Sequence, residues 1–258
     1  MKKKQKITLL LTLCMLVSLF TPALQAKAAQ TKEVYLLKQY NAKGVSKEKY
    51  SYDKNGLLVK SNNTTFNIID KYTYQGQLLT KQVQTDKNSI KQIWELTYDN
   101  NRLAQINYED NYDFKYTSKY SYDKKGRISK RVYKETGAEA AAKPSTYKYT
   151  YNNKGYITKI KITGILPDTV KYTYDKNGTV KTYKNNYSDY SMKAEYESGN
   201  LSTLIIKDLS SEDKNDTVTY TFTYEKVKIP ESYLDTVEAQ QKALLNFVQS
   251  APQFVFGN

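Results

Sequence analysis

The chain has 258 residues, including 26 tyrosines, one cysteine and no histidine, and its formal net charge is +14. The lack of histidine excludes Ser-His-Asp triads, Cys-His pairs and zinc sites with imidazole ligands. Acid–base catalysis would therefore fall to Asp, Glu, Lys, Tyr or Cys. The sequence shows no phosphate-binding loop, nucleophile elbow or metal motif, so we expect no cofactor, no metal site and no catalytic residue.

Residues 1–28 have the composition of a secretory signal peptide. Four lysines precede an apolar stretch over 7–20, and Ala26, Lys27 and Ala28 form a small-x-small cleavage pattern. We predict cleavage after Ala28 and a secreted protein, extracellular or wall-associated, with no transmembrane span in the remainder. Cleavage would remove five lysines and the single cysteine, leaving 230 residues with a net charge of +9. Packing without disulfides must then stabilise the mature chain. The lysine-rich leader and body are typical of a Gram-positive secretor.

A degenerate unit recurs along most of the chain. Clear copies read YSYDKNGLLVK at 50–60, YSYDKKGRISKRVY at 120–133 and YTYDKNGTVKTY at 172–183. The second aromatic residues of successive copies are 22 to 29 residues apart, a period that indicates an array of supersecondary units. These second aromatics are Tyr52, Tyr74, Tyr98, Tyr122, Tyr151, Tyr174, Tyr196 and Tyr224.

Each unit predicts a β-hairpin. Both rings of a Tyr-x-Tyr segment point to one face of a strand, because side chains alternate. A turn carboxylate can accept hydrogen bonds from backbone N–H groups two residues on, and the glycine suits a positive φ. The apolar phase changes just after the turn, which predicts a β-bulge. The turn positions are Asp53, Asp99, Asp123 and Asp175 for the carboxylate, and Gly56, Gly76, Gly126, Gly155, Gly178 and Gly199 for the glycine, with Asn101 replacing glycine in the copy at Tyr98.

The predicted fold is therefore all-β: an antiparallel meander of repeated hairpins with about 14 to 16 strands, over residues 29–228. Such a sheet would hide its apolar face by curving into an open barrel or a shell. Pro230 is expected to open an amphipathic C-terminal helix, and residues 229–258 form this helix and a tail. We expect the helix to act as a plug, a cap or an arm that docks on a protein partner.

The pattern Y-x-Y-D-x-x-G-x-[LIV] resembles the YD repeat of RHS proteins, and the likeness covers residues 50–228. RHS chains are longer and enclose a C-terminal toxin in a hollow β-shell. The chain also resembles small secreted bacterial proteins with degenerate YD-like repeats, some described as having a porin-like sheet. The resemblance implies a β-shell or barrel, and carbohydrate binding is the role usually suggested for such repeats.

The tyrosines admit two readings, because aromatic faces can stack on sugar rings or fill a core. The repeated Tyr-x-Tyr pairs and Trp94 are predicted to be core residues, since they recur in phase. Four tyrosines in the stretches between repeats are better candidates for binding: Tyr112, Tyr116, Tyr187 and Tyr190.

Lysines such as Lys159, Lys161 and Lys181 fall on the opposite strand face and form a positive surface. It is either a solvated face or a site for an anionic polymer. We therefore expect a secreted, non-catalytic protein that binds a glycan, an anionic wall polymer or a protein, and no nucleic acid. The alternatives are an RHS-like shell that serves toxin delivery, and an envelope hydrolase that uses two facing carboxylates.

Overall fold

The computed structural model describes residues 30–136, 143–212 and 216–250, so the predicted signal peptide, residues 1–28, lies outside the described residues. The described part contains sixteen strands, a short 3₁₀ helix η1 (Glu231–Tyr233) and helix α2 (Leu234–Ser250). The strands are β1 (Thr31–Ala42), β2 (Ser46–Tyr52), β3 (Leu58–Asn63), β4 (Ile68–Gln75), β5 (Leu78–Thr85), β6 (Lys91–Asp99), β7 (Arg102–Asp110), β8 (Lys115–Tyr122), β9 (Ile128–Glu135), β10 (Ser145–Tyr151), β11 (Ile157–Thr163), β12 (Asp168–Tyr174), β13 (Val180–Lys184), β14 (Asp189–Glu197), β15 (Asn200–Asp208) and β16 (Thr217–Pro230).

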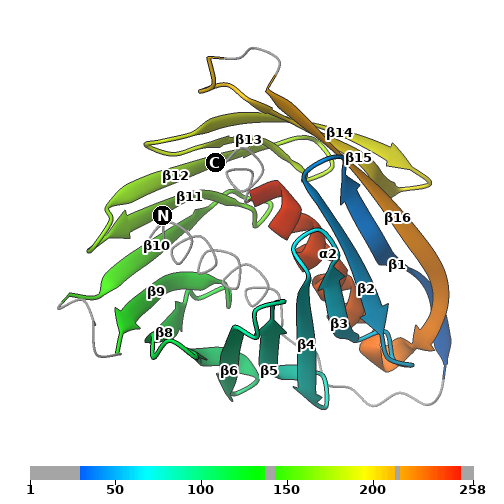
Figure 1. The fold of residues 1–258 in the computed structure, drawn as a ribbon, viewed down its shortest axis with the longest axis horizontal. Coiled ribbons are helices and arrows are strands. Elements are labelled where there is room, and N and C mark those ends of the chain that lie inside the picture. Colours follow the sequence, from blue (N-terminus) through cyan, green and yellow to red (C-terminus); the bar gives the residue numbers. More distant parts are fainter. Residues whose placement is uncertain (1–29, 137–142, 213–215, 251–258) are drawn as a thin grey trace.

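The strands follow one another in chain order around a closed antiparallel barrel, in which β1 pairs with both β2 and β16 (Figure 1). The predicted all-β meander is confirmed, and the sheet closes completely. Because every connection joins neighbouring strands, the connections alternate between the two ends of the barrel. We call the end with the Tyr-x-Tyr turns the turn end, and the opposite end, with the connections between repeats, the loop end.

A β-bulge follows each of the seven complete Tyr-x-Tyr turns. In the first, Tyr52 pairs with Leu58 and Ser51 with Lys60, so Val59 is the extra residue. The predicted bulge is thus confirmed. Several bulged residues carry a hydroxyl group that donates to a carbonyl oxygen on the opposite strand, which satisfies an acceptor beside the irregularity. These bonds run from Thr80 to Thr73, Ser129 to Ser121, Thr158 to Thr150, and Ser202 to Glu195.

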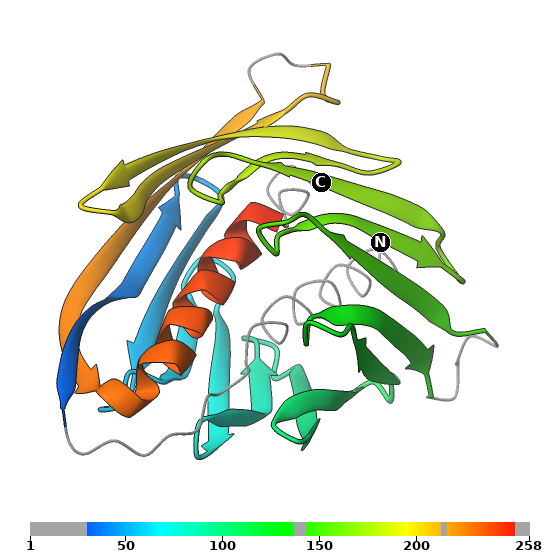
Figure 2. The ribbon, with the colours of Figure 1, turned by 180° about the vertical axis from the view of Figure 1, so that it is seen from behind.

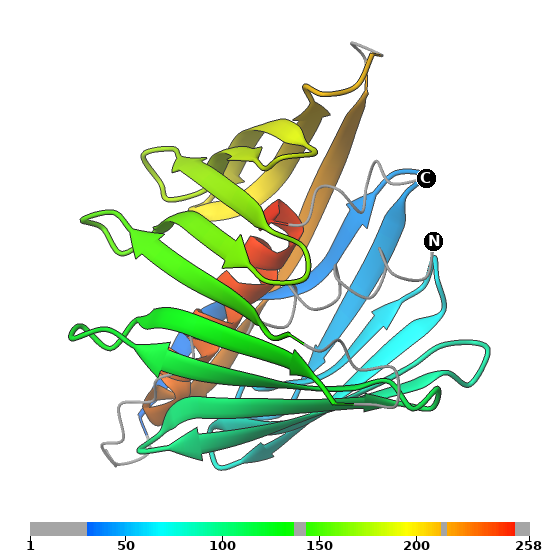
Figure 3. The same ribbon diagram turned by 90° about the vertical axis from the view of Figure 1, so that its left-hand side faces the viewer.

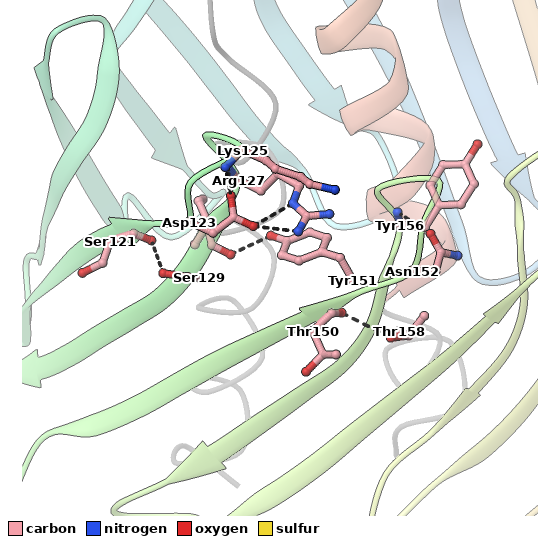
Figure 4. Close-up of polar contacts among 11 residues, drawn as sticks. Ser121, Asp123, Lys125, Arg127, Ser129, Thr150, Tyr151, Asn152, Tyr156 and Thr158 are labelled. Carbon is pink, nitrogen blue, oxygen red and sulfur yellow. Dashed lines mark hydrogen bonds and ion pairs between the residues drawn. The ribbon is translucent and has the colours of Figure 1, made fainter.

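The turn carboxylates mostly act as predicted. Oδ1 of Asp53 accepts the backbone N–H groups of Asn55 and Leu57 at 2.8 and 2.9 Å. The same pair of bonds forms in other repeats, to Asp123, Asn152 and Asp175. Figure 4 shows Asp123 in this position, where it also binds the Arg127 guanidinium at 2.7 Å.

The turn after Asp99 differs from this prediction. Asp99 ends β6 and pairs with Arg102, so only two residues connect the strands. Both of them, Asn100 and Asn101, have positive φ values of 49° and 60°. A two-residue hairpin turn needs this backbone shape, and asparagine tolerates it well. Asn101 therefore replaces glycine as predicted, but Asp99 does not accept the two turn N–H groups.

The hydroxyl groups of the second aromatics form a regular ladder. In most repeats the hydroxyl donates to the carbonyl oxygen of the apolar residue that follows the preceding turn. Burial raises the pKa of these hydroxyls, to about 12 for Tyr122 and Tyr151. Each bond joins one hairpin to the previous one, so these tyrosines link the hairpins by hydrogen bonds in addition to packing in the core. The six bonds, of 2.6 to 2.9 Å, run from Tyr52 to Leu37, Tyr98 to Leu79, Tyr122 to Leu103, Tyr151 to Ile128, Tyr174 to Ile157, and Tyr224 to Leu201.

The last, incomplete repeat is completed by the first strand of the barrel. Tyr224 of β16 pairs with Leu37 of β1, and the register then shifts at Lys38, as in the other repeats. The chain therefore closes through an eighth unit whose two halves lie at opposite ends of the sequence. We call β16, β1 and β2 the seam.

Helix α2 lies inside the ring of strands, as a plug would (Figures 1, 2 and 3). Oε1 of Gln240 accepts the N–H of Leu58 at 2.9 Å, and Oε1 of Gln241 accepts the N–H of Leu37 at 2.7 Å. Oε1 of Gln240 also accepts a hydrogen bond from the Tyr74 hydroxyl, which for this reason does not bond to the previous hairpin as the other ladder tyrosines do. Because α2 touches the ladder, the tyrosine face lines the interior and the lysine face lies outside.

The helix begins later than predicted. Pro230 does not open it, since β16 continues to Pro230, which pairs with Thr31 of β1. A proline can end a strand because its missing N–H is not needed there. Helix α2 starts only at Leu234, after η1.

Candidate anion-binding face

Strands β9–β13 carry eight exposed lysines, and six of them face another lysine directly across a strand pair. Strands β10–β13 alternate between mostly aromatic or aliphatic inward residues and outward lysine or threonine, and on β9 the buried Arg131 separates the outward Lys130 and Val132. The strand period of two therefore places the six lysines outside. We call the six the lysine stripe: Lys130, Lys148, Lys159, Lys161, Lys171 and Lys184.

Strand register arranges the lysine stripe in two rows. Lys148 of β10 pairs directly with Lys130 of β9 and with Lys161 of β11. Lys171 of β12 likewise pairs with Lys159 of β11 and Lys184 of β13. The rows meet on β11, where Lys159 and Lys161 are two residues apart.

Directly opposed lysines are unusual because like charges across a strand pair destabilise a sheet. Their Cβ atoms lie about 4.5–5.5 Å apart in such pairs. Within the described part of the chain, Lys184 is the one member of the lysine stripe with an ion pair, to Asp189 at 2.6 Å. The other five ammonium groups therefore form a concentrated positive surface.

Elsewhere in the described sheet the register opposes only one further pair of lysines, Lys60 and Lys71 on β3 and β4, and some outer lysines pair with carboxylates. Lys81 pairs with Glu95 at 2.9 Å on β5 and β6, and Lys226 of β16 pairs with Glu33 of β1 at 2.6 Å. The hydrogen-bonded Lys226 ammonium lowers the pKa of the Glu33 carboxyl. Directly paired lysines are thus concentrated on β9–β13, away from the seam.

The four tyrosines predicted to bind ligand are not brought together. Tyr112 and Tyr187 are 67% and 75% exposed, but they lie in loop-end connections separated by six strands. Tyr116 and Tyr190 are only 4% and 3% exposed. Tyr116 stacks on Tyr108 at 4.6 Å. As buried core residues, Tyr116 and Tyr190 present no free ring face to a ligand outside the barrel, which corrects their assignment.

The structure confirms Trp94 as a core residue, since it is 2% exposed. Its indole N–H donates to the Tyr116 hydroxyl at 3.0 Å. The Tyr-x-Tyr rings are mostly buried or half-buried too, although Tyr196 is 37% exposed. The tyrosines of the repeats therefore lie mainly in the interior of the barrel and not on its surface.

Two inward carboxylates near the seam were not anticipated. Asp70 is 6% exposed and accepts amide N–H bonds from Gln82 at 2.8 Å and Gln84 at 3.0 Å. Burial, with a smaller effect of Asp70, raises the pKa of Glu48 to about 7. The two acids lie on β2 and β4 of one wall and share Ser61 as a neighbour, so they do not face each other across a cleft.

No helix in the described residues is both long enough and apolar enough to cross a membrane.

Comparison with known proteins gives likenesses of fold. No family model and no curated protein matches the sequence. Among solved structures, a porin-like protein from Bacteroides uniformis aligns over 75% of this chain and 96% of its own length, with 11% identity and a TM-score of 0.49. A porin-like protein from Bacteroides vulgatus covers 74% of this chain and 99% of its own, with 11% identity and a TM-score of 0.40.

A toxin complex is also similar in part. The Photorhabdus luminescens Tc holotoxin pore structure includes a chain that aligns with 67% of this chain at 17% identity and a TM-score of 0.30. This chain spans only 9% of that much longer one.

Proposed function

We propose that this protein is a secreted, non-catalytic barrel that binds an anionic polymer of the cell envelope through the lysine stripe. The supporting observation is the register, which places Lys148 between Lys130 and Lys161, and Lys171 between Lys159 and Lys184. A polyanion would neutralise this repulsion and release its own counterions, as basic surfaces do on nucleic acid backbones.

The stripe favours a charged polymer over a neutral glycan. Glycan stacking needs neighbouring exposed rings, and the exposed Tyr112 and Tyr187 lie six strands apart. The lysine stripe also argues against insertion of the barrel into a bilayer, because strands that face lipid carry an outward apolar band. Here the outward residues of β10–β12 are lysines and threonines.

The experiment compares two triple variants with equal charge change. K148E/K161E/K171E reverses the centre of the lysine stripe, and K49E/K71E/K207E reverses three exposed outer lysines on β2, β4 and β15. Each protein is mixed with purified Gram-positive cell walls, before and after chemical removal of their phosphodiester polymers, and the retained fraction is measured.

We expect wild type and the control variant to bind intact walls and to lose most binding on stripped walls. The stripe variant should bind neither. An equal loss of wall binding in both variants would show that only the net charge of the protein matters. Wild-type binding that is unchanged on stripped walls would contradict recognition of the anionic polymer. Circular dichroism checks that both variants fold.

A further inference from the structure

A separate pocket lies at the turn end, between α2 and two repeat turns. It has a volume of about 280 Å³ and is lined by Asn177, Thr179, Tyr196, Asn200, Lys242 and Leu245 among others. The turns after Tyr174 and Tyr196 form one wall, and α2 forms the other. We call it the helix pocket; it lies on the interior face, whereas the lysine stripe lies outside.

Lys242 gives the helix pocket a positive charge. Its ammonium lies 5.3 Å from the centroid of the Tyr156 ring. The Tyr156 ring stacks on Tyr174 at 4.9 Å, and its hydroxyl lies so close to Gly178 that a side chain there would clash. The ring is thus fixed by its neighbours and positions the ammonium at the pocket wall. Lys242 forms no ion pair with any residue in the described ranges.

The carboxylate of the turn that lines the pocket, Asp175, forms no ion pair with this lysine. Oδ1 of Asp175 accepts the backbone N–H groups of Asn177 and Thr179 at 2.8 and 2.9 Å, so the carboxylate serves its own turn. The remaining polar lining consists of amide and hydroxyl groups, including Asn200 and the Thr179 hydroxyl bonded to that of Tyr196. Lys242 is exposed, and Glu238 lies one turn before it on α2, but the lining of the pocket holds one ammonium and no carboxylate, a composition that suits an anion.

Size limits the ligand further. A volume of about 280 Å³ is slightly below the range of pockets that enclose drug-sized molecules. It admits a small molecule but not a folded segment of polymer. The aromatic and aliphatic lining from Tyr196, Tyr224 and Leu245 would contact the carbon skeleton of such a molecule.

We propose that the helix pocket binds a small organic anion, with a phosphate or carboxylate group on the Lys242 ammonium and its polar body against the turn amides and hydroxyls. Because one wall is α2, bound ligand would also hold the helix inside the barrel. Any ligand that binds only the folded state raises its stability in proportion to occupancy.

The test uses three ligands with the same carbon skeleton. Glycerol 3-phosphate carries phosphate, glycerate carries carboxylate and glycerol carries no charge. Isothermal titration calorimetry on the full mature chain measures each, in wild type, in K242M and in the control K87M, whose lysine is exposed in the distant loop between β5 and β6.

We expect at least one of the two anions, and not glycerol, to bind wild type and K87M with similar affinity. K242M should weaken that binding by about tenfold or more, as loss of a charge-assisted bond does. The preferred anion then identifies the acidic group. Equal affinity in K242M and wild type, or no binding of either anion at tens of millimolar, would overturn the proposal. Because K148E/K161E/K171E leaves the pocket intact, the two proposals fail independently.

Discussion

The seam and the opposite wall of β9–β13 are built from the same repeat, yet they are completed differently. At the seam, β1 supplies the missing half of the last repeat, and Gln240 and Gln241 of α2 accept hydrogen bonds from the backbone N–H groups of Leu58 and Leu37. The opposite wall consists of unbroken hairpins joined by the tyrosine ladder through Tyr151 and Tyr174.

The outer faces differ as well. The seam carries the paired charges Lys226 and Glu33, whereas the opposite wall carries the lysine stripe. Inward positions of the repeat thus build the barrel everywhere, and the outward positions vary from region to region. We therefore expect stability to be most sensitive at the seam and the adjoining strands that Gln240 and Gln241 bond, and binding to be most sensitive on the outer face of β9–β13.

The largest expected effect on stability is a difference between alanine substitutions at two glycines that occupy the same turn position in different repeats. Gly56 and Gly155 have φ values of +82° and +85°, so alanine at either should cost about 1–2 kcal/mol. A Cβ at Gly56 would also lie 2.8 Å from Cγ2 of Ile229 and 3.1 Å from Cγ2 of Val237, while Gly155 has open space. We expect Gly56→Ala to lower the free energy of unfolding by about 3–4 kcal/mol and Gly155→Ala by about 1–2.

Urea unfolding measures both variants. Equal losses would show that the packing of α2 on the seam adds no constraint at Gly56.

The next effect is a pH dependence of the free energy of unfolding, caused by the two buried carboxyl groups near the seam. Burial raises the pKa of Glu48 from 4.5 to about 7 and also raises that of Asp70. The folded state then holds a proton that the unfolded chain releases, so stability should fall as pH rises from about 5 to 7 and level off above. We expect a change of about 1–3 kcal/mol in wild type and a flatter profile in Glu48→Gln. Melting temperatures across this range measure it, and a flat wild-type profile would contradict the buried acid.

A smaller effect tests the ladder itself. Tyr98→Phe removes the 2.7 Å hydrogen bond to the carbonyl oxygen of Leu79 and keeps the ring. We expect a loss of about 0.5–1.5 kcal/mol in the free energy of unfolding. Tyr112→Phe is the control, because that side chain is exposed in a loop-end connection and should change stability by less than about 0.5 kcal/mol. Similar values for the two variants would show that the ladder bond contributes nothing.

Much of this fold was predictable from local chemistry. Tyr-x-Tyr alternation, the turn carboxylate of Asp53 and the phase change at Leu58 each act within one hairpin, so the sequence predicts them directly. Closure was not predictable, because β1 lacks the Tyr-x-Tyr signature and is recognised only by its pairing with Tyr224. The role of Gln240 depends on a contact 182 residues away in sequence, with Leu58.

The candidate site was predictable only in part. Outward phase for Lys159 and Lys161 followed from strand alternation. The opposition of Lys161 to Lys148 depends on the turn and bulge within one hairpin, and that of Lys159 to Lys171 depends on the register between hairpins. Tyr116 and Tyr190 were misassigned because position between repeats does not reveal which way a side chain points. Strands β8 and β14 begin earlier than the repeat signature and turn both rings inward.

The most direct measurement is the affinity for a defined polyanion, inorganic polyphosphate, at several salt concentrations. Wild type and K49E/K71E/K207E should bind alike, with affinity that falls steeply as salt rises. K148E/K161E/K171E should bind at least about tenfold more weakly, with a salt slope reduced by about three, one for each lysine removed. An unchanged affinity and slope in the stripe variant would contradict the assignment of β9–β13 as the binding face.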